Sequence, residues 1–245
     1  MTVAAYVTDN PVNIGTGAIL VGVLAVAAAG LDLPGAELLT VGTLQRSLQA
    51  ATPIALAAIG GLFAEKSGVF NIGLEGFMIF GALTAAAVSW FIAGDTSVSQ
   101  ADLWVGVLPA VVVCRILTYI FAPLTIRYKA DPIVVGLAVW FIGLGFGPFT
   151  ATVIWGGVSS PTLPNINSVT VPVLAEVPVL GRLIFDASPL VLFTIALAIV
   201  AWVVLYRTRY GYWVQAAGEN PEALDTAGVD VNRVRYATVV FSGVM

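Results

Sequence analysis

Apolar runs of about bilayer length recur along this whole sequence, and they limit the fold more than any motif does. A helix needs about 20 predominantly apolar residues to cross the hydrocarbon core. Only helices and closed barrels satisfy every backbone polar group there. The sequence therefore predicts an all-α, polytopic transmembrane helical bundle in a single domain over residues 1–245. We expect spans near 14–30, 44–64, 69–93, 103–126, 133–154 and 188–206, with an incomplete one at 236–245.

The composition supports a membrane protein and excludes several function classes. Hydrophobic residues make up 59% of the 245 and charged residues 10%, whereas a soluble domain has roughly a quarter charged residues. A net charge of −4 without a basic stripe argues against nucleic-acid binding. The chain has no histidine and one cysteine, so a histidine-based catalyst and an internal disulfide are impossible. We expect no metal site and no cofactor.

A short segment at 60–67, GGLFAEKS, has the outline of a phosphate-binding loop. That loop needs a second glycine where Glu65 stands, and a carboxylate at this position would repel phosphate. We therefore reject the match. Any ATP used by this protein is expected to bind to another subunit.

The stretch 52–81 carries the most informative polar residues. Its apolar run breaks at Glu65-Lys66-Ser67-Gly68 and resumes with Asn71 and Glu75, which are four apart and would share one face of a helix. A charged side chain at mid-bilayer costs on the order of 3 kcal/mol, so it faces a bundle interior or a wet cavity. We expect a broken helix around residues 65–76 that either fixes helix packing or forms a substrate pathway. The candidate pathway residues here are Asn71, Gly73, Glu75 and Gly76.

Arg115 lies near the middle of the predicted span 103–126. An unpaired guanidinium at that depth is costly, so it needs an acceptor or water. An ion pair with Glu75 is one interpretation, because Glu75 is the carboxylate most clearly placed within a span. The two residues differ in their expected depth, which favours a backbone carbonyl or cavity water as the partner. Arg115 is a further candidate for the substrate pathway.

Lysine and arginine counts predict the orientation in the membrane. If the polar loop 207–235 is cytoplasmic, alternation places the basic residues that follow the second and fourth spans on the same side. The loops on the opposite side, at 31–42, 95–102 and 155–187, carry only Arg182 among them. This asymmetry follows the positive-inside rule. We expect a multi-pass protein of the cell membrane with a cytoplasmic N-terminus and an extracellular cap loop at 155–187.

The segment 218–228, GENPEALDTAG, predicts a short capped helix within the cytoplasmic loop. Asn220 is a suitable N-cap, Pro221 suits the first helical position, and Gly228 is a typical stop. Acidic residues in the helix complement the positive end of its dipole. Such a helix is too short to be stable alone and needs a partner surface; a plain solvated turn is the alternative. The residues assigned to it are Asn220, Pro221, Glu222, Ala223, Leu224, Asp225 and Gly228.

Two of these stretches carry a family resemblance. TPIALAAIGGLFAEKSGVFNIGLEGFMIFGA, from residue 52, resembles the signature of permease subunits of ABC importers for nucleosides and simple sugars. The segment from Arg209 to Gly228 resembles their cytoplasmic loop and the importer pattern Glu-Ala-Ala, three residues, Gly, with Leu224 replacing the second alanine. The wording of residues 71–76, NIGLEG, favours the nucleoside branch over the ribose-type and branched-chain amino-acid branches. The likeness covers roughly residues 49–245.

The resemblance implies a transport subunit rather than an enzyme. In such importers two permease subunits form the pathway, two ATP-binding subunits bind beneath them, and an extracellular solute-binding protein delivers the solute. Residues 221–227 would be the coupling helix that binds an ATP-binding subunit, and Asn71 and Glu75 would lie near the pathway. Permeases for simple sugars or branched-chain amino acids are alternatives, and an ion-coupled secondary transporter is an alternative of another class. Because family members continue past Gly243 with further helices, we expect the sequence to be truncated.

Overall fold

A computed structural model of the chain describes residues 41–94, 97–170 and 186–245. The predicted span 14–30, the side of the membrane on which the N-terminus lies, and Arg182 fall outside these residues. The chain forms two compact units, one from residues 1–52 and 168–193 and the other from 53–167 and 194–245. Helices α3 and α9 each begin in the first unit and continue into the second.

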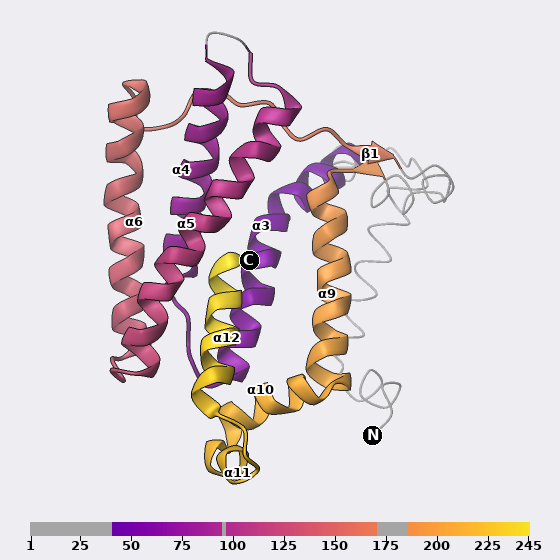
Figure 1. Ribbon diagram of the computed structural model, residues 1–245. Coiled ribbons are helices and arrows are strands. Elements are labelled where there is room, and N and C mark those ends of the chain that lie inside the picture. Colours follow the sequence, from indigo (N-terminus) through magenta and orange to yellow (C-terminus); the bar gives the residue numbers. More distant parts are fainter. Residues whose placement is uncertain (1–40, 95–96, 171–185) are drawn as a thin grey trace, which may run out of the picture. The chain divides into compact units, whose positions relative to one another are not determined.

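Helices make up most of the described chain (Figure 1). Five of them, within the described residues, are long and apolar enough to cross a membrane: α3, α4, α5, α6 and α9. The predicted all-α, polytopic fold class is therefore confirmed. The helices are α3 (Val41–Lys66), α4 (Leu74–Ala93), α5 (Gln100–Ile126), α6 (Pro132–Trp155), α9 (Pro189–Arg207), α10 (Arg209–Glu219), α11 (Pro221–Thr226) and α12 (Val231–Val244).

Local capping explains where several helices begin and end. Ser99 and Asp102 form a reciprocal capping box at the start of α5. Asp131 caps α6 by accepting a hydrogen bond from the amide of Ile133, and Gly156, with φ of 73°, ends the helix. Helix α12 starts at Val231 instead of 236, because the Asp230 side chain accepts a hydrogen bond from the amide of Arg233. The polar loop predicted at 207–235 is thus mostly helical.

The first unit contains the small amount of strand in the described chain. Strand β1 (Val169–Thr170) pairs antiparallel with β2 (Asp186–Ala187), with Val169 opposite Ala187. Both strands fall within the loop predicted at 155–187. Residues 156–168, in front of β1, have no helix or strand. The pairing joins the two described ends of this loop.

In the second unit, α4 packs against both α5 and α6, and α12 packs against α5. The α4–α6 contact is close because glycines line it. A Cβ added at Gly76 would lie 2.7 Å from the carbonyl oxygen of Val139, and one added at Gly147 would lie 2.9 Å from a methyl carbon of Ile79. Lipid is as apolar as these side chains, so close packing rather than water exclusion holds such helices together.

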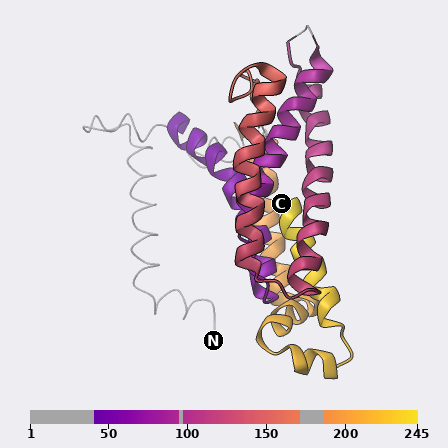
Figure 2. The same ribbon diagram turned by 90° about the vertical axis from the view of Figure 1, so that its left-hand side faces the viewer.

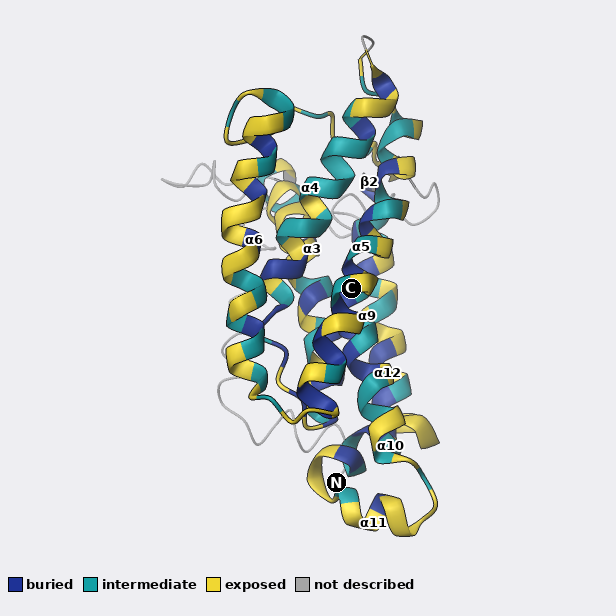
Figure 3. Cartoon of the chain, turned by 60° about the vertical axis from the view of Figure 1, so that its left-hand side comes forward, coloured by how far each residue is buried: buried dark blue, intermediate teal, exposed yellow. Residues whose placement is uncertain are grey.

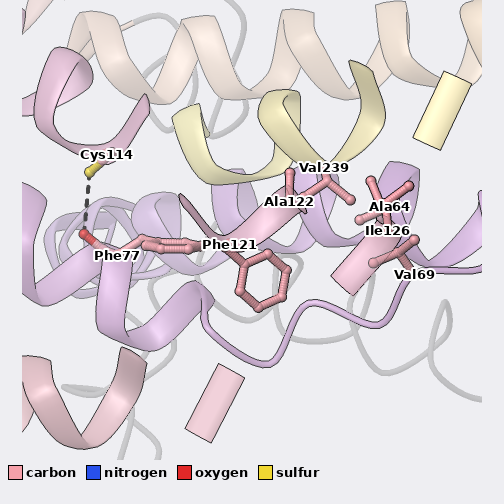
Figure 4. Close-up of a cluster of buried hydrophobic side chains, with 8 residues drawn as sticks. All are labelled: Ala64, Val69, Phe77, Cys114, Phe121, Ala122, Ile126 and Val239. Atoms are coloured by element: carbon pink, nitrogen blue, oxygen red, sulfur yellow. Dashed lines mark hydrogen bonds between the residues drawn. The ribbon is translucent and has the colours of Figure 1, made fainter. Parts of the chain in front are cut away.

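A buried core cluster joins α3, α4, α5, α12 and the segment between α3 and α4 (Figure 4). The Cys114 thiol donates a hydrogen bond to the carbonyl oxygen of Phe77 at 3.3 Å, and the rings of Phe77 and Phe121 meet edge to face at 6.0 Å. Phe77 of α4 therefore contacts α5 through both its backbone carbonyl and its ring. Its members are Ala64, Val69, Phe77, Cys114, Phe121, Ala122, Ile126 and Val239.

The outer faces of α5 and α6 are largely exposed (Figure 3). Large apolar residues occupy them, including Leu108 and Ile120 on α5 and Phe141 and Phe149 on α6. Exposed large apolar residues in such number mark a membrane or protein contact. Their position on two helices of membrane-spanning length supports contact with lipid.

Candidate functional site

The predicted break lies between Lys66, where α3 ends, and Leu74, where α4 begins. We call residues 67–73 the α3–α4 link. Gly68 adopts φ of 87°, and its amide donates to the carbonyl of Glu65 while the amide of Val69 donates to that of Ala64. These two bonds form a Schellman motif, which ends a helix at a glycine in the left-handed conformation. The broken helix predicted around 65–76 is confirmed.

Asn71 and Glu75 do not share a helix face, so that part of the prediction is wrong. Asn71 belongs to the link, whereas Glu75 is in the first turn of α4. The Asn71 side chain is buried, with 7% of its surface exposed, and its Nδ2 donates to Ser242 Oγ at 2.7 Å. This bond holds Asn71 outside the helix. Glu75 is exposed, so the burial expected for its carboxylate is not observed either.

The Oδ1 atom of Asn71 is buried and has no hydrogen-bond partner in the described part of the chain. Ser242 Oγ accepts from Asn71 Nδ2 and donates to the carbonyl of Val239. A buried acceptor without a partner costs about 1–3 kcal/mol. Asn71 thus holds an acceptor in the link that water or a solute could satisfy.

The other two pathway candidates in this stretch, Gly73 and Gly76, are buried against α6. A Cβ added at Gly136 would lie 2.8 Å from the backbone nitrogen of Gly73. Gly76 faces the Val139 carbonyl, as described above. Both glycines therefore allow close approach of the link and α4 to α6, which is the packing role considered for this stretch.

Arg115 is exposed on α5 and interacts with the next turn of the same helix. Its Nη2 donates to the hydroxyl of Tyr119 at 3.3 Å, and its guanidinium lies 5.5 Å from the Tyr119 ring centroid. Within the described residues, the ion pair found is that of Arg233 with Asp230, so Arg115 does not pair with Glu75. In the described part of the chain, the hydrogen-bond partner of Arg115 is the Tyr119 hydroxyl rather than a backbone carbonyl.

A pocket of about 410 Å³ lies between α5 and α12 beside Arg115. Three aromatic side chains line it, those of Tyr119, Tyr236 and Phe241. Its chemistry is therefore that of an apolar, aromatic cavity with one strong hydrogen-bond donor. The full lining is Arg115, Tyr119, Tyr236, Ala237, Val240, Phe241 and Val244.

Helix α11 forms as the capping signals predict. Asn220 Oδ1 accepts a hydrogen bond from the amide of Ala223 at 3.0 Å, and Pro221 is the first helical residue. Gly228 adopts φ of 82° just past the end. Leu224 is buried with 4% exposure, whereas the acidic residues of the helix are exposed. In the described chain α11 is therefore anchored through Leu224 and presents Glu222 and Asp225 outward.

One polar contact region was missed by the sequence analysis. Arg235, Thr238 and Ser242 of α12 all bond to the α3–α4 link. Their spacing of three and four residues within an apolar run places them on one helix face, and this pattern could have identified them. Figures 1 and 2 show that α10, α11 and the start of α12 lie at the end of this unit where α3 ends.

Comparison with known proteins places the chain in a family. Residues 43–245 match the family described as "Branched-chain amino acid transport system / permease component". The chain is 36% identical to the guanosine ABC transporter permease protein NupQ of Bacillus subtilis, over 79% of this chain and 60% of that protein. It is 33% identical to the nucleoside ABC transporter permease protein NupC of Lactococcus lactis, over 79% of this chain and 61% of that protein.

A third relative is the glucose ABC transporter permease protein TsgB13 of Haloferax volcanii, which is 28% identical over 99% of this chain and 67% of its own length. The chain spans about 60% of the length of the two nucleoside permeases. No solved structure gives a significant match.

Proposed function

Because the chain belongs to the family of branched-chain amino acid transport system permease components, we propose that it is a membrane-spanning subunit of an ATP-driven importer. In this proposal it forms half of the solute pathway and leaves ATP hydrolysis to a separate subunit. The observation that carries the proposal is the joint presence of a broken helix with a buried polar residue, Asn71, and a capped, outward-facing helix, α11, in a chain of this family.

The proposed solute is a nucleoside. Two of the relatives are named as permeases for guanosine and for nucleosides. The pocket beside Arg115 supports this choice, because aromatic rings favour stacking on a flat base and arginine donates to base acceptors such as those of guanine. A sugar is the alternative, since a glucose permease is also a relative, and the family name adds branched-chain amino acids.

We place the pathway along the α3–α4 link and the pocket beside Arg115. Asn71 contributes its unpartnered Oδ1 acceptor, and Arg115 contributes a donor. Glu75, on the exposed start of α4, belongs to the same proposal. Gly73 and Gly76 act by letting α4 approach α6, which keeps the start of α4 in place.

We propose three protein partners. An ATP-binding subunit binds α11, whose exposed acidic residues Glu222 and Asp225 offer a charged contact surface. A second permease subunit supplies the other half of the pathway, and an extracellular solute-binding protein delivers the nucleoside. The protein lies in the cell membrane with its N-terminus in the cytoplasm; the basic residues at the ends of α3, α5 and α9 support that orientation.

The test is uptake of radiolabelled guanosine by vesicles that contain the chain with its partner subunits. We expect uptake that requires ATP and persists when a protonophore collapses the proton gradient. The ion-coupled alternative predicts the reverse, and Glu75→Gln would then abolish uptake. Uptake that ignores ATP and stops with the protonophore would exclude the importer.

A further inference from the structure

One face of α12 is bonded to the α3–α4 link along its length. The Nε of Arg235 donates to the carbonyl oxygen of Ser67 at 3.1 Å, and the hydroxyl of Thr238 donates to Ser67 Oγ at 2.8 Å. One turn further on, Ser242 accepts from Asn71. Ser67 and Ser242 are fully buried. The link is therefore fixed to α12 at Ser67 and at Asn71.

Arg235 also reaches a third element. Its Nη2 donates to the carbonyl oxygen of Ala217 at 2.8 Å. Ala217 is fully buried near the end of α10, and Asn220, the cap of α11, follows shortly after it. One guanidinium thus joins the end of α3 to the end of α10, directly before the helix proposed to bind the ATP-binding subunit.

The electrostatics of this contact favour arginine. Carbonyls at the ends of helices carry partial negative charge, and both acceptors of Arg235 are of this kind. Among the described residues no carboxylate forms an ion pair with Arg235. The planar guanidinium presents donors in a fixed geometry, whereas a lysine ammonium is a point charge on a flexible stem. Arg235 therefore fixes the distance between the two helix ends as lysine could not.

Beside the Arg235 contact, the link and α10 meet through two glycines. A Cβ added at Gly68 would lie 3.2 Å from the Cα of Gly218, and one added at Gly218 would clash with the carbonyl oxygen of Lys66. Two glycines allow the backbones to approach closely, but they have no side chains that could interlock. Val214 of α10 also packs in a buried cluster with Phe63 near the end of α3, and the guanidinium adds the polar contact between α10 and the link.

We propose that Arg235 is the positioning residue that transmits movement of α10 and α11 to the α3–α4 link and to Asn71. This inference rests on the proposed importer function and names the residue through which the ATP-binding subunit acts on the link. Arg235 touches neither solute nor ATP. It acts by making the positions of Ser67 and Ala217 depend on each other.

The functional test compares Arg235→Gln and Arg235→Lys with Arg233→Gln in the complete transporter. Arg233 is the matched control, because it lies on the same helix with its side chain 88% exposed. For both Arg235 variants we expect solute moved per ATP hydrolysed to fall roughly 5- to 150-fold, the usual range for coupling between sites. Arg233→Gln should match the parent. Parental stoichiometry in Arg235→Gln would overturn the proposal.

A second measurement does not depend on transport. Asn220→Ala removes the cap of α11, and hydrogen exchange then reports whether the amides of residues 67–73 become less protected. We expect the loss of protection to spread to this segment in the parent background and to be absent when Arg235→Gln is already present, as in a double-mutant cycle. The same spread in both backgrounds would contradict the inference. Lack of ATP-driven uptake in the parent, with the cycle still showing coupling, would refute the importer function alone.

Discussion

Asn71 and Ser242 are 171 positions apart in the sequence, and the Asn71 amide donates to the Ser242 hydroxyl at 2.7 Å within a buried site. The bond fixes the non-helical segment between α3 and α4 against α12. Helix α12 is therefore part of the candidate site, although its sequence indicates only the start of another apolar span.

Removing one partner of this bond should cost more than removing both. Ser242→Ala leaves the Asn71 Nδ2 group buried without an acceptor, which costs about 1–3 kcal/mol. Asn71→Leu with Ser242→Ala replaces both polar groups by apolar ones of similar size and should be closer to the parent in stability. Thermal unfolding of the purified protein in detergent measures the difference. A double variant less stable than Ser242→Ala would contradict this account.

Gly76→Val should separate α4 from α6. The added side chain would meet the Val139 carbonyl, since a Cβ alone lies 2.7 Å from that oxygen, and overpacking of this kind costs about 1–3 kcal/mol. Gly145→Ala on α6 is the control, because a Cβ there meets nothing within 4 Å. We expect the unfolding temperature to fall for Gly76→Val and to stay at the parental value for Gly145→Ala. Equal unfolding temperatures would show that the contact is not tight.

Glu222→Arg should uncouple ATP hydrolysis from uptake without preventing membrane insertion. Glu222 is exposed in the first turn of α11, so the chain loses about 0.3–1 kcal/mol of helix-dipole stabilisation and gains a cation that the dipole disfavours by a similar amount, while the surface offered to the ATP-binding subunit reverses its charge. Glu222→Gln removes the negative charge without reversing it and serves as the control. The measurement is stimulation of ATPase activity by solute; stimulation equal to the parent would refute the assignment of α11.

Arg115→Met should weaken solute handling while leaving the fold intact. The side chain is exposed, and its polar contact among the described residues is with the Tyr119 hydroxyl. Loss of a donor to a base should raise the solute concentration for half-maximal uptake roughly 5- to 150-fold, equivalent to about 1–3 kcal/mol. Tyr119→Phe removes the intrahelical bond alone and should keep the parental value. An unchanged half-maximal concentration in Arg115→Met would remove the pocket from the pathway.

Local sequence signals predicted the parts of the site that depend on neighbouring residues. Asn220, Pro221 and Gly228 specify α11 through capping chemistry, which acts over a few residues. The break was predicted from another local signal, the interruption of the apolar run at residues 65–68. Asn71 was placed wrongly because helical spacing to Glu75 is a local rule, whereas the bond to Ser242 acts across the fold.

The contacts of Arg235 could not be predicted in the same way. Ser67 and Ala217 accept through backbone carbonyls, and every residue has such a group, so nothing in the sequence identifies the acceptors. The donor, Arg235, lies in the segment 207–235, which the sequence analysis interpreted as a polar loop. Recognising Asp230 as an N-cap would have extended α12 to include Arg235 and would have placed it in line with Thr238 and Ser242.

The position of Cys114 makes the chain suitable for site-directed labelling. It is the single cysteine of the sequence, it is buried, and its thiol is bonded to a backbone carbonyl inside the core cluster. Buried thiols of this kind are chemically inert. A maleimide fluorophore will therefore react first with a cysteine introduced at an exposed site such as Asp225, so that the native thiol need not be replaced before spectroscopy.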